Sequence, residues 1–179
     1  MIIFLNGAFG IGKTTVARLL RDRLPGSAIF DPELFGMVLQ RLPRWIPGSG
    51  RGTDDFQDLA RWRRGNIGAM RLAHAFRSTL IVPMAFSNLD YLREFLDGAE
   101  RFDPAIRHFC LTAPLAVVRE RIERRAGRGR AVDRSWQLRR AAECCSAHQA
   151  PEFAEHVATE HRTPEDIALE IDRRIRSCR

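Results

Sequence analysis

The sequence predicts an α/β fold in which a parallel sheet carries helices on both faces. Five short apolar runs alternate with segments of helical periodicity, and this βαβα order is typical of parallel sheets. The third run, residues 79–84, is apolar and rich in β-branched residues, as expected for a strand buried on both faces. Since ligands bind at the carboxyl ends of such strands, we expect the functional residues at that edge.

The individual elements follow from local patterns. After the first run at residues 2–6, a helix is predicted over about 13–24, with a leucine- and valine-rich face and a stop at Pro25-Gly26. The runs at 28–30, 79–84, 108–111 and 156–159 predict the other strands.

The last helix is predicted over about 163–177, because Thr163-Pro164 is a good N-cap and the first turn is acidic. Its apolar stripe favours packing against the sheet; a membrane-surface helix is the alternative, since the polar face is basic. The stripe consists of Ile167, Ala168, Ile171 and Ile175.

Length and composition indicate one domain over residues 1–179. No apolar run approaches the roughly 20 residues that a membrane span needs. Residues 1–6 lack the features of a signal peptide, so we expect a cytoplasmic location. The net charge of +7 is spread along the chain without a recognition motif, so no nucleic-acid partner is expected. The four cysteines lack a metal-binding spacing and are interpreted as reduced thiols.

A phosphate-binding motif lies between the first strand and the first helix. Residues 7–14 match GxxxxGK[ST], which predicts a P-loop NTPase fold that binds ATP and Mg²⁺. Successive backbone N–H groups would surround the phosphates, Lys13 would reach the β- and γ-phosphates, and Thr14 would bind Mg²⁺. The predicted nucleotide-binding residues are Gly7, Ala8, Phe9, Gly10, Ile11, Gly12, Lys13, Thr14 and Thr15.

Lys13 is the only lysine among 29 basic residues. A compact ammonium and a planar guanidinium are not interchangeable among phosphates, so this choice favours a working site.

Asp31 is the candidate catalytic base, because it ends the second apolar run and can accept a proton from an acceptor hydroxyl. Alternatively it caps the helix that Pro32 would begin, and the two roles can coexist. Glu33 is a weaker candidate. The third strand ends without a carboxylate, so either Asp31 helps to hold Mg²⁺ through water or Thr14 and the phosphates suffice.

The absence of DxxG and NKxD elements and the short chain favour a small-molecule or nucleotide kinase over a GTPase or a larger ATPase. Arg121 and Arg125 share one helix face, before a Gly/Arg loop. We predict a lid over about 119–135 in which both arginines neutralise charge in the transition state; the alternative is a solvated basic helix.

An insertion at about 36–65 combines aromatic and polar side chains, which suits a pocket for an acceptor with rings or an apolar portion. A small satellite core is the alternative. The predicted substrate-binding residues are Phe35, Phe56, Gln57, Trp62, Arg63 and Met84.

These segments together resemble the ATP-binding tunicamycin resistance proteins. The resemblance rests on "IIFLNGAFGIGKT" from Ile2, "FDPELFG" at 30–36, "DDFQ" at 54–57, "LIVPM" at 80–84, "PEF" at 151–153 and "HVATE" at 156–160. That family is adenylate-kinase-like and similar to chloramphenicol phosphotransferases.

The resemblance implies a five-stranded parallel sheet, a lid, and an adenine site between the lid and the loop after Thr159. It implies phosphate and Mg²⁺ roles for Lys13 and Thr14, a base role for Asp31, and lid roles for Arg121 and Arg125. It also implies membrane contact through the C-terminal helix. The implied activity is ATP-dependent phosphorylation of a nucleoside antibiotic with uracil, sugars and an acyl chain. A non-catalytic, ATP-gated drug-binding protein and a metabolic small-molecule or nucleotide kinase are the alternatives.

Overall fold

The computed structural model describes residues 1–34, 56–125 and 134–177. Its sheet has five parallel strands in the order β2-β3-β1-β4-β5, which confirms the predicted α/β architecture. The strands are β1 (Ile2–Gly7), β2 (Ser27–Ile29), β3 (Thr79–Pro83), β4 (Ile106–Thr112) and β5 (His156–Ala158). The helices are α1 (Lys13–Arg23), α3 (Ala60–His74), α4 (Leu89–Glu100), α5 (Leu115–Arg125), α6 (Arg134–Ala147) and α7 (Pro164–Arg176), with 3-10 turns η1 (Phe56–Asp58) and η2 (Pro151–Phe153).

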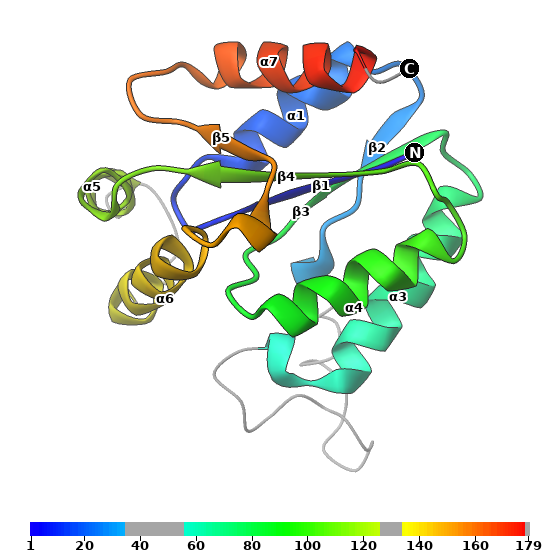
Figure 1. Ribbon diagram of the computed structural model, residues 1–179, viewed down its shortest axis with the longest axis horizontal. Coiled ribbons are helices and arrows are strands. Elements are labelled where there is room, and N and C mark those ends of the chain that lie inside the picture. The colour runs from blue at the N-terminus through cyan, green and yellow to red at the C-terminus, as the bar shows by residue number, and fades with distance from the viewer. Residues whose placement is uncertain (35–55, 126–133, 178–179) are drawn as a thin grey trace.

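Helices cover both faces of the sheet. As Figure 1 shows, α1 and α7 lie on one face, α3 and α4 lie on the other, and α5 and α6 lie where β1 and β4 end. The central strand β1 is buried on both sides: Ile3 and Leu5 contact the core under α1, while Ile2 and Phe4 contact the core over α3 and α4. This two-sided burial explains the continuous apolar run.

The C-terminal helix packs as its apolar stripe predicts. Ile167, Ala168, Ile171 and Ile175 are at most 3% exposed and belong to the core that also contains residues of α1. The Thr163 hydroxyl accepts a hydrogen bond from the Asp166 N–H at 3.1 Å, which is the predicted N-cap. Among the described residues, no helix combines the length and apolar character that a membrane crossing requires.

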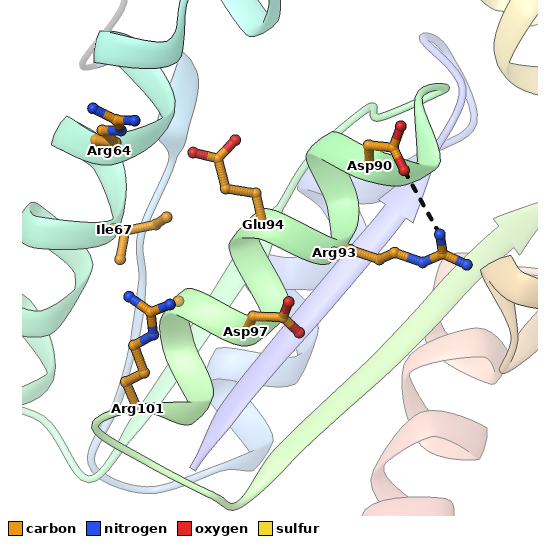
Figure 2. A pocket seen from close by; sticks show the side chains of 8 residues that line it. Arg64, Ile67, Asp90, Arg93, Glu94, Asp97 and Arg101 are labelled. Carbon is orange, nitrogen blue, oxygen red and sulfur yellow. Dashed lines mark ion pairs between the residues drawn. The ribbon is translucent and has the colours of Figure 1, made fainter.

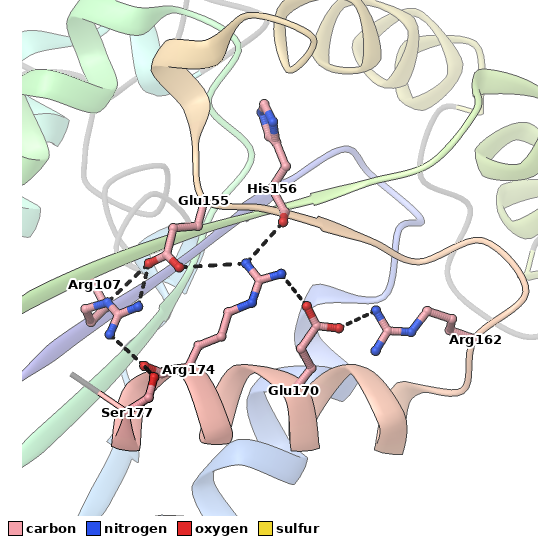
Figure 3. Close-up of polar contacts among 7 residues, drawn as sticks. All are labelled: Arg107, Glu155, His156, Arg162, Glu170, Arg174 and Ser177. Carbon is pink, nitrogen blue, oxygen red and sulfur yellow. Dashed lines mark hydrogen bonds and ion pairs between the residues drawn. The ribbon is translucent and has the colours of Figure 1, made fainter. Parts of the chain in front are cut away.

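An ion-pair network ties β5 to β4 and α7 (Figure 3). Arg107 of β4 contacts Glu155 at 2.6 Å, and Glu155 also faces Arg174 of α7 at 3.7 Å. Arg174 pairs in turn with Glu170, which contacts Arg162 at 2.6 Å. Because Arg162 lies in the β5–α7 loop, its contact with Glu170 ties this loop to α7.

Four predicted features lie wholly or partly outside the described residues. Phe35, which is predicted to bind substrate, and most of the insertion at 36–65 fall outside, as does the side chain of Phe56. Residues 126–133 of the predicted lid also fall outside.

Candidate functional site

The loop that carries the GxxxxGK[ST] motif turns sharply at two glycines. Gly10 and Gly12 have φ angles of +79° and +110°, which side-chain-bearing residues rarely adopt. At Gly10 a side chain is also excluded by its neighbour, since a Cβ atom would lie 2.6 Å from Cγ1 of Ile122 in α5. The glycines therefore let the chain turn from β1 into α1 while α5 packs closely against the loop.

The N-terminus of α1 suits a bound phosphate. No side chain caps it, and its first turn contains no acidic residue. The backbone N–H groups of that turn and the helix dipole thus present positive charge at the end of the loop. The side chain of Thr14 is exposed there, as a Mg²⁺ ligand needs to be. These observations fit a nucleotide and its metal ion.

The ammonium of Lys13 lies inside the loop. Its Nζ atom donates hydrogen bonds to the carbonyl oxygens of Gly7 and Ala8 at 2.8 and 2.9 Å and lies 5.3 Å from the centre of the Phe9 ring. Burial lowers the pKa of Lys13, and the charge of Glu33 opposes that shift more strongly than any other group. A positive charge is thus held where the motif predicts phosphates.

Asp31 and Glu33 follow β2, and the charge of Glu33 acts on Lys13. The Asp31 Oδ1 atom accepts a hydrogen bond from the Glu33 N–H at 3.0 Å, so the capping role is real. Among the described residues, its other oxygen has no hydrogen-bond partner and remains available for a second role. The sequence favours Asp31 over Glu33 as the base, yet it is the carboxylate of Glu33 that raises the pKa of Lys13 more than any other charged group does.

The two predicted lid arginines behave differently. The Arg121 guanidinium donates to the carbonyl oxygens of Ile11 and Thr159 at 3.2 and 2.8 Å and to the Thr159 hydroxyl at 2.9 Å. It therefore joins the P-loop to the β5–α7 loop. Arg125 is exposed, and its charge contributes to lowering the pKa of Lys13, so it lies within electrostatic reach of the phosphate site. The catalytic roles of both remain predictions.

Two of the predicted substrate-binding residues are buried in the core. Trp62 is 3% exposed and Met84 is 4% exposed, and both belong to the cluster over α3 and α4. The Trp62 ring packs at 5.8 Å from Phe95 and 6.4 Å from Phe86. This core is part of the main fold and not a small satellite core. Contact of Trp62 and Met84 with a substrate stays a prediction.

The two polar members of the predicted pocket also have intramolecular partners. Gln57 donates from Nε2 to the Ala85 carbonyl oxygen at 3.2 Å. Arg63 donates to the Gln57 carbonyl oxygen at 2.6 Å, pairs with Glu94 and stacks 4.0 Å from the Tyr91 ring. They join η1 and α3 to α4 and to the chain after β3. Contact with a substrate stays a prediction for both.

The carboxyl end of β3 is held by side chains that sequence reasoning missed. Asn6 is fully buried at the end of β1 and bonds to both the N–H and the carbonyl group of Phe86, at 2.9 and 3.1 Å. His148 contacts the same carbonyl at 2.7 Å, and Arg140 donates to the Ser87 hydroxyl at 3.2 Å. The one sequence signal for these contacts was Asn6 itself, a polar residue at the end of an apolar strand.

Among the residues that the structure describes, two cavities lie outside the loop itself. One of about 610 Å³ separates Arg64 and Ile67 of α3 from a charged face of α4 (Figure 2) and contains none of the predicted site residues. The other, of about 320 Å³, lies at the carboxyl ends of β4 and β5. Ala158 and Glu160, which flank Thr159, line this second cavity. The predicted adenine site near Thr159 remains a prediction.

Comparison with known proteins agrees with this geometry. A family model described as an AAA domain matches residues 2–150, while no curated protein matches the chain. The solved tunicamycin resistance protein of Deinococcus radiodurans is 31% identical, with a TM-score of 0.76 over 97% of this chain and 94% of that one.

Two solved kinases share the fold at lower identity. A gluconokinase from Sinorhizobium meliloti is 17% identical, with a TM-score of 0.64 over 98% of this chain and 91% of its own. A shikimate kinase from Acinetobacter baumannii, in complex with shikimate, is 18% identical, with a TM-score of 0.60 over 99% of this chain and 94% of its own.

Proposed function

This chain belongs to the AAA-domain family and is 31% identical to the tunicamycin resistance protein of Deinococcus radiodurans, and from these two similarities we propose that it is an ATP-dependent small-molecule kinase. The observation that carries the proposal is the Lys13 ammonium, which is held inside the P-loop and within the field of the Glu33 carboxylate. Asp31 and Glu33 follow β2, so an acceptor hydroxyl bound between them and the loop would meet both a base and a phosphate site.

The loop and the start of α1 would hold the nucleotide. The backbone N–H groups from Gly10 to Thr14 would bind the phosphates, and Lys13 would leave its two carbonyl partners for phosphate oxygens. The Thr14 hydroxyl is exposed at the place where a metal ligand is needed. When bound, Mg²⁺ supplies neutralisation of charge on the β- and γ-phosphates.

Asp31 is proposed as the base. Its Oδ1 atom is engaged by the cap, while the second oxygen can accept the proton that the acceptor hydroxyl loses as its oxygen bonds to the γ-phosphorus. The bond between that phosphorus and the β–γ bridging oxygen would break in the same step, and ADP would be the leaving group. Glu33 is held within the field of Lys13 and would orient the acceptor or a metal-bound water. Arg125 would add positive charge from α5.

The acceptor is proposed to be tunicamycin or a related nucleoside or sugar compound. The support is the 31% identity to a tunicamycin resistance protein over almost the whole of both chains. The second candidate is an ATP-gated protein that sequesters the drug without chemistry, and the observation that favours it is the carboxyl end of β3. That segment, Met84 to Ser87, carries no carboxylate for Mg²⁺.

Mass spectrometry separates these candidates. Purified protein is incubated with Mg²⁺-ATP and tunicamycin, and the drug is examined for the mass gain of one phosphoryl group. A kinase gives this product with the wild type and none with Lys13→Ala. ATP-dependent retention of unmodified drug on the protein supports the sequestering function instead. Phosphorylation of sugars or other small metabolites, with tunicamycin untouched, supports a metabolic kinase.

Substitution of Asp31 tests its role within the kinase. Asparagine caps helices about as well as aspartate, so Asp31→Asn should keep the fold, but it cannot accept the proton. We expect kcat to fall by about 10²–10⁴ with ATP binding retained. Recovery of activity at raised Mg²⁺ would indicate metal positioning instead, and near-normal turnover would remove Asp31 as the base.

A further inference from the structure

One side of α6 is aligned with the nucleotide site. Residues spaced four apart lie on one face of a helix, and here every fourth side chain from position 136 to position 148 contacts either the P-loop or the chain just after β3. These four residues are Trp136, Arg140, Cys144 and His148.

The first three contacts are of different chemical kinds. The Trp136 ring meets the Phe9 ring of the P-loop edge-on, with 5.0 Å between centroids. Further along, Arg140 donates to the Ser87 hydroxyl and the Cys144 thiol donates to the Ala85 carbonyl at 3.6 Å. Thus α6 contacts both the P-loop and the chain just after β3.

His148, just beyond the end of α6, makes a contact that is also buried. It is 2% exposed, and burial lowers its pKa to about 4, so the ring is neutral with a single N–H at neutral pH. Its Nε2 atom lies 2.7 Å from the Phe86 carbonyl oxygen. Only an Nε2–H donor makes that distance favourable, because an unprotonated nitrogen would oppose its lone pair to the oxygen. The Phe86 carbonyl therefore fixes the tautomer.

Asn6 extends this contact to the P-loop. Its Nδ2 atom donates to the same Phe86 carbonyl, while its Oδ1 atom accepts from the N–H groups of Phe86 and Gly7, both at 2.9 Å. The 3.4 Å approach of Nδ2 to the His148 ring is then a packing contact between two donors. A continuous chain of hydrogen bonds runs from His148 through Phe86 and Asn6 to the first N–H of the loop.

We propose that His148 is a positioning residue for the nucleotide site, which sets the P-loop and the end of β3 through Phe86 and Asn6. The inference rests on the proposed function, since it predicts an effect on ATP binding. His148 does not touch the nucleotide. It acts by holding the backbone whose N–H groups would bind the phosphates, and small displacements of such groups weaken binding and catalysis.

Two amide substitutions provide a matched test. In His148→Gln the side-chain amide can still donate to the Phe86 carbonyl, whereas in His148→Asn the chemically identical amide is one methylene shorter. The dissociation constant of ATP is measured by calorimetric titration for the wild type and both variants. We expect His148→Asn to bind ATP about tenfold more weakly, as the loss of one buried hydrogen bond would cause, and His148→Gln to bind near the wild-type level.

A destabilised control separates positioning from general loss of stability. Ile175→Ala creates a cavity in the core under α7, away from these contacts, and should lower Tm without changing the ATP affinity of the folded protein. Equal ATP affinities for His148→Asn and His148→Gln would overturn the proposal, and so would a loss in Ile175→Ala as large as that in His148→Asn. A wild-type protein that does not bind ATP would instead refute the proposed function, and this inference with it.

Discussion

Protonation of His148 should lower the stability of the protein in mild acid. The pKa of His148 is lowered from 6.5 to about 4, first by burial and then by the nearby charge of Lys13, although the Phe86 carbonyl opposes the shift. A group whose pKa is lower in the folded state binds protons more tightly when unfolded. Its stabilising effect is therefore complete above pH 6.5 and is lost as the pH falls towards 4.

The magnitude follows from the two pKa values. A depression of about 2.5 units corresponds to about 3 kcal/mol across the whole window. At about pH 5 the unfolded side chain is almost fully protonated and the folded one mostly neutral, which gives about 2 kcal/mol. No discount for solvent is needed, because the side chain is 2% exposed. This is a large share of the roughly 5–15 kcal/mol that stabilises a domain.

Urea denaturation of the wild type and His148→Gln, at about pH 7.5 and about pH 5, measures this effect. Carboxylates and the other histidines titrate in both proteins, so their contributions cancel in the difference between the two pH-dependent losses. We expect the wild type to lose about 2 kcal/mol more than the variant. Equal losses would refute the assignment of a depressed pKa to His148.

Three further predictions concern the P-loop and its neighbours. Lys13→Ala should abolish ATP turnover while circular dichroism stays unchanged, because the ammonium contacts only loop carbonyls; turnover at the wild-type rate would refute the P-loop function. Arg121→Ala should lower kcat and should also lower the free energy of unfolding, measured with urea, by about 1–3 kcal/mol, because the Thr159 and Ile11 carbonyls lose the Arg121 donor. A variant unchanged in both quantities would support the alternative that α5 is a solvated basic helix. Gly10→Ala should lower Tm, because the new Cβ would lie 2.6 Å from Ile122 and the backbone φ is +79°. The free energy of unfolding should fall by about 1–3 kcal/mol, and an unchanged Tm would contradict the close packing of α5 on the loop.

The fold could be predicted from local patterns because each pattern has one physical reading. The apolar run of β1 needs burial on both faces, and the strand-loop-helix motif fixes its direction relative to α1. The stripe of α7 predicted its packed face down to the four buried apolar residues. Strand order is different. No local pattern within β2, β3 or β4 indicates that β1 lies in the centre, and the strand order comes from the structure.

The site was harder to predict, because the charge or aromatic character of a residue does not indicate which residues it will contact in the folded protein. Trp62 is an aromatic residue near a polar segment, yet it lies in the main core. Arg121 is predicted to belong to a lid, and the structure shows that its guanidinium donates a hydrogen bond to Thr159, 38 positions further along the chain. His148 gave no periodic signal, because its partners, Asn6 and Phe86, come from two other segments. Long-range pairing is set by tertiary structure, which single-sequence patterns do not encode.

The position of Lys13 makes the protein open to selective chemical labelling. It carries the one lysine side chain in the sequence, and burial within the loop lowers its pKa, so more of the amine is unprotonated and nucleophilic than in an exposed lysine at the same pH. Acylating reagents that modify lysine would thus find a single side chain, and it lies in the phosphate site. The extent of its modification, with and without an added nucleotide, would report occupancy of the site before any acceptor is identified.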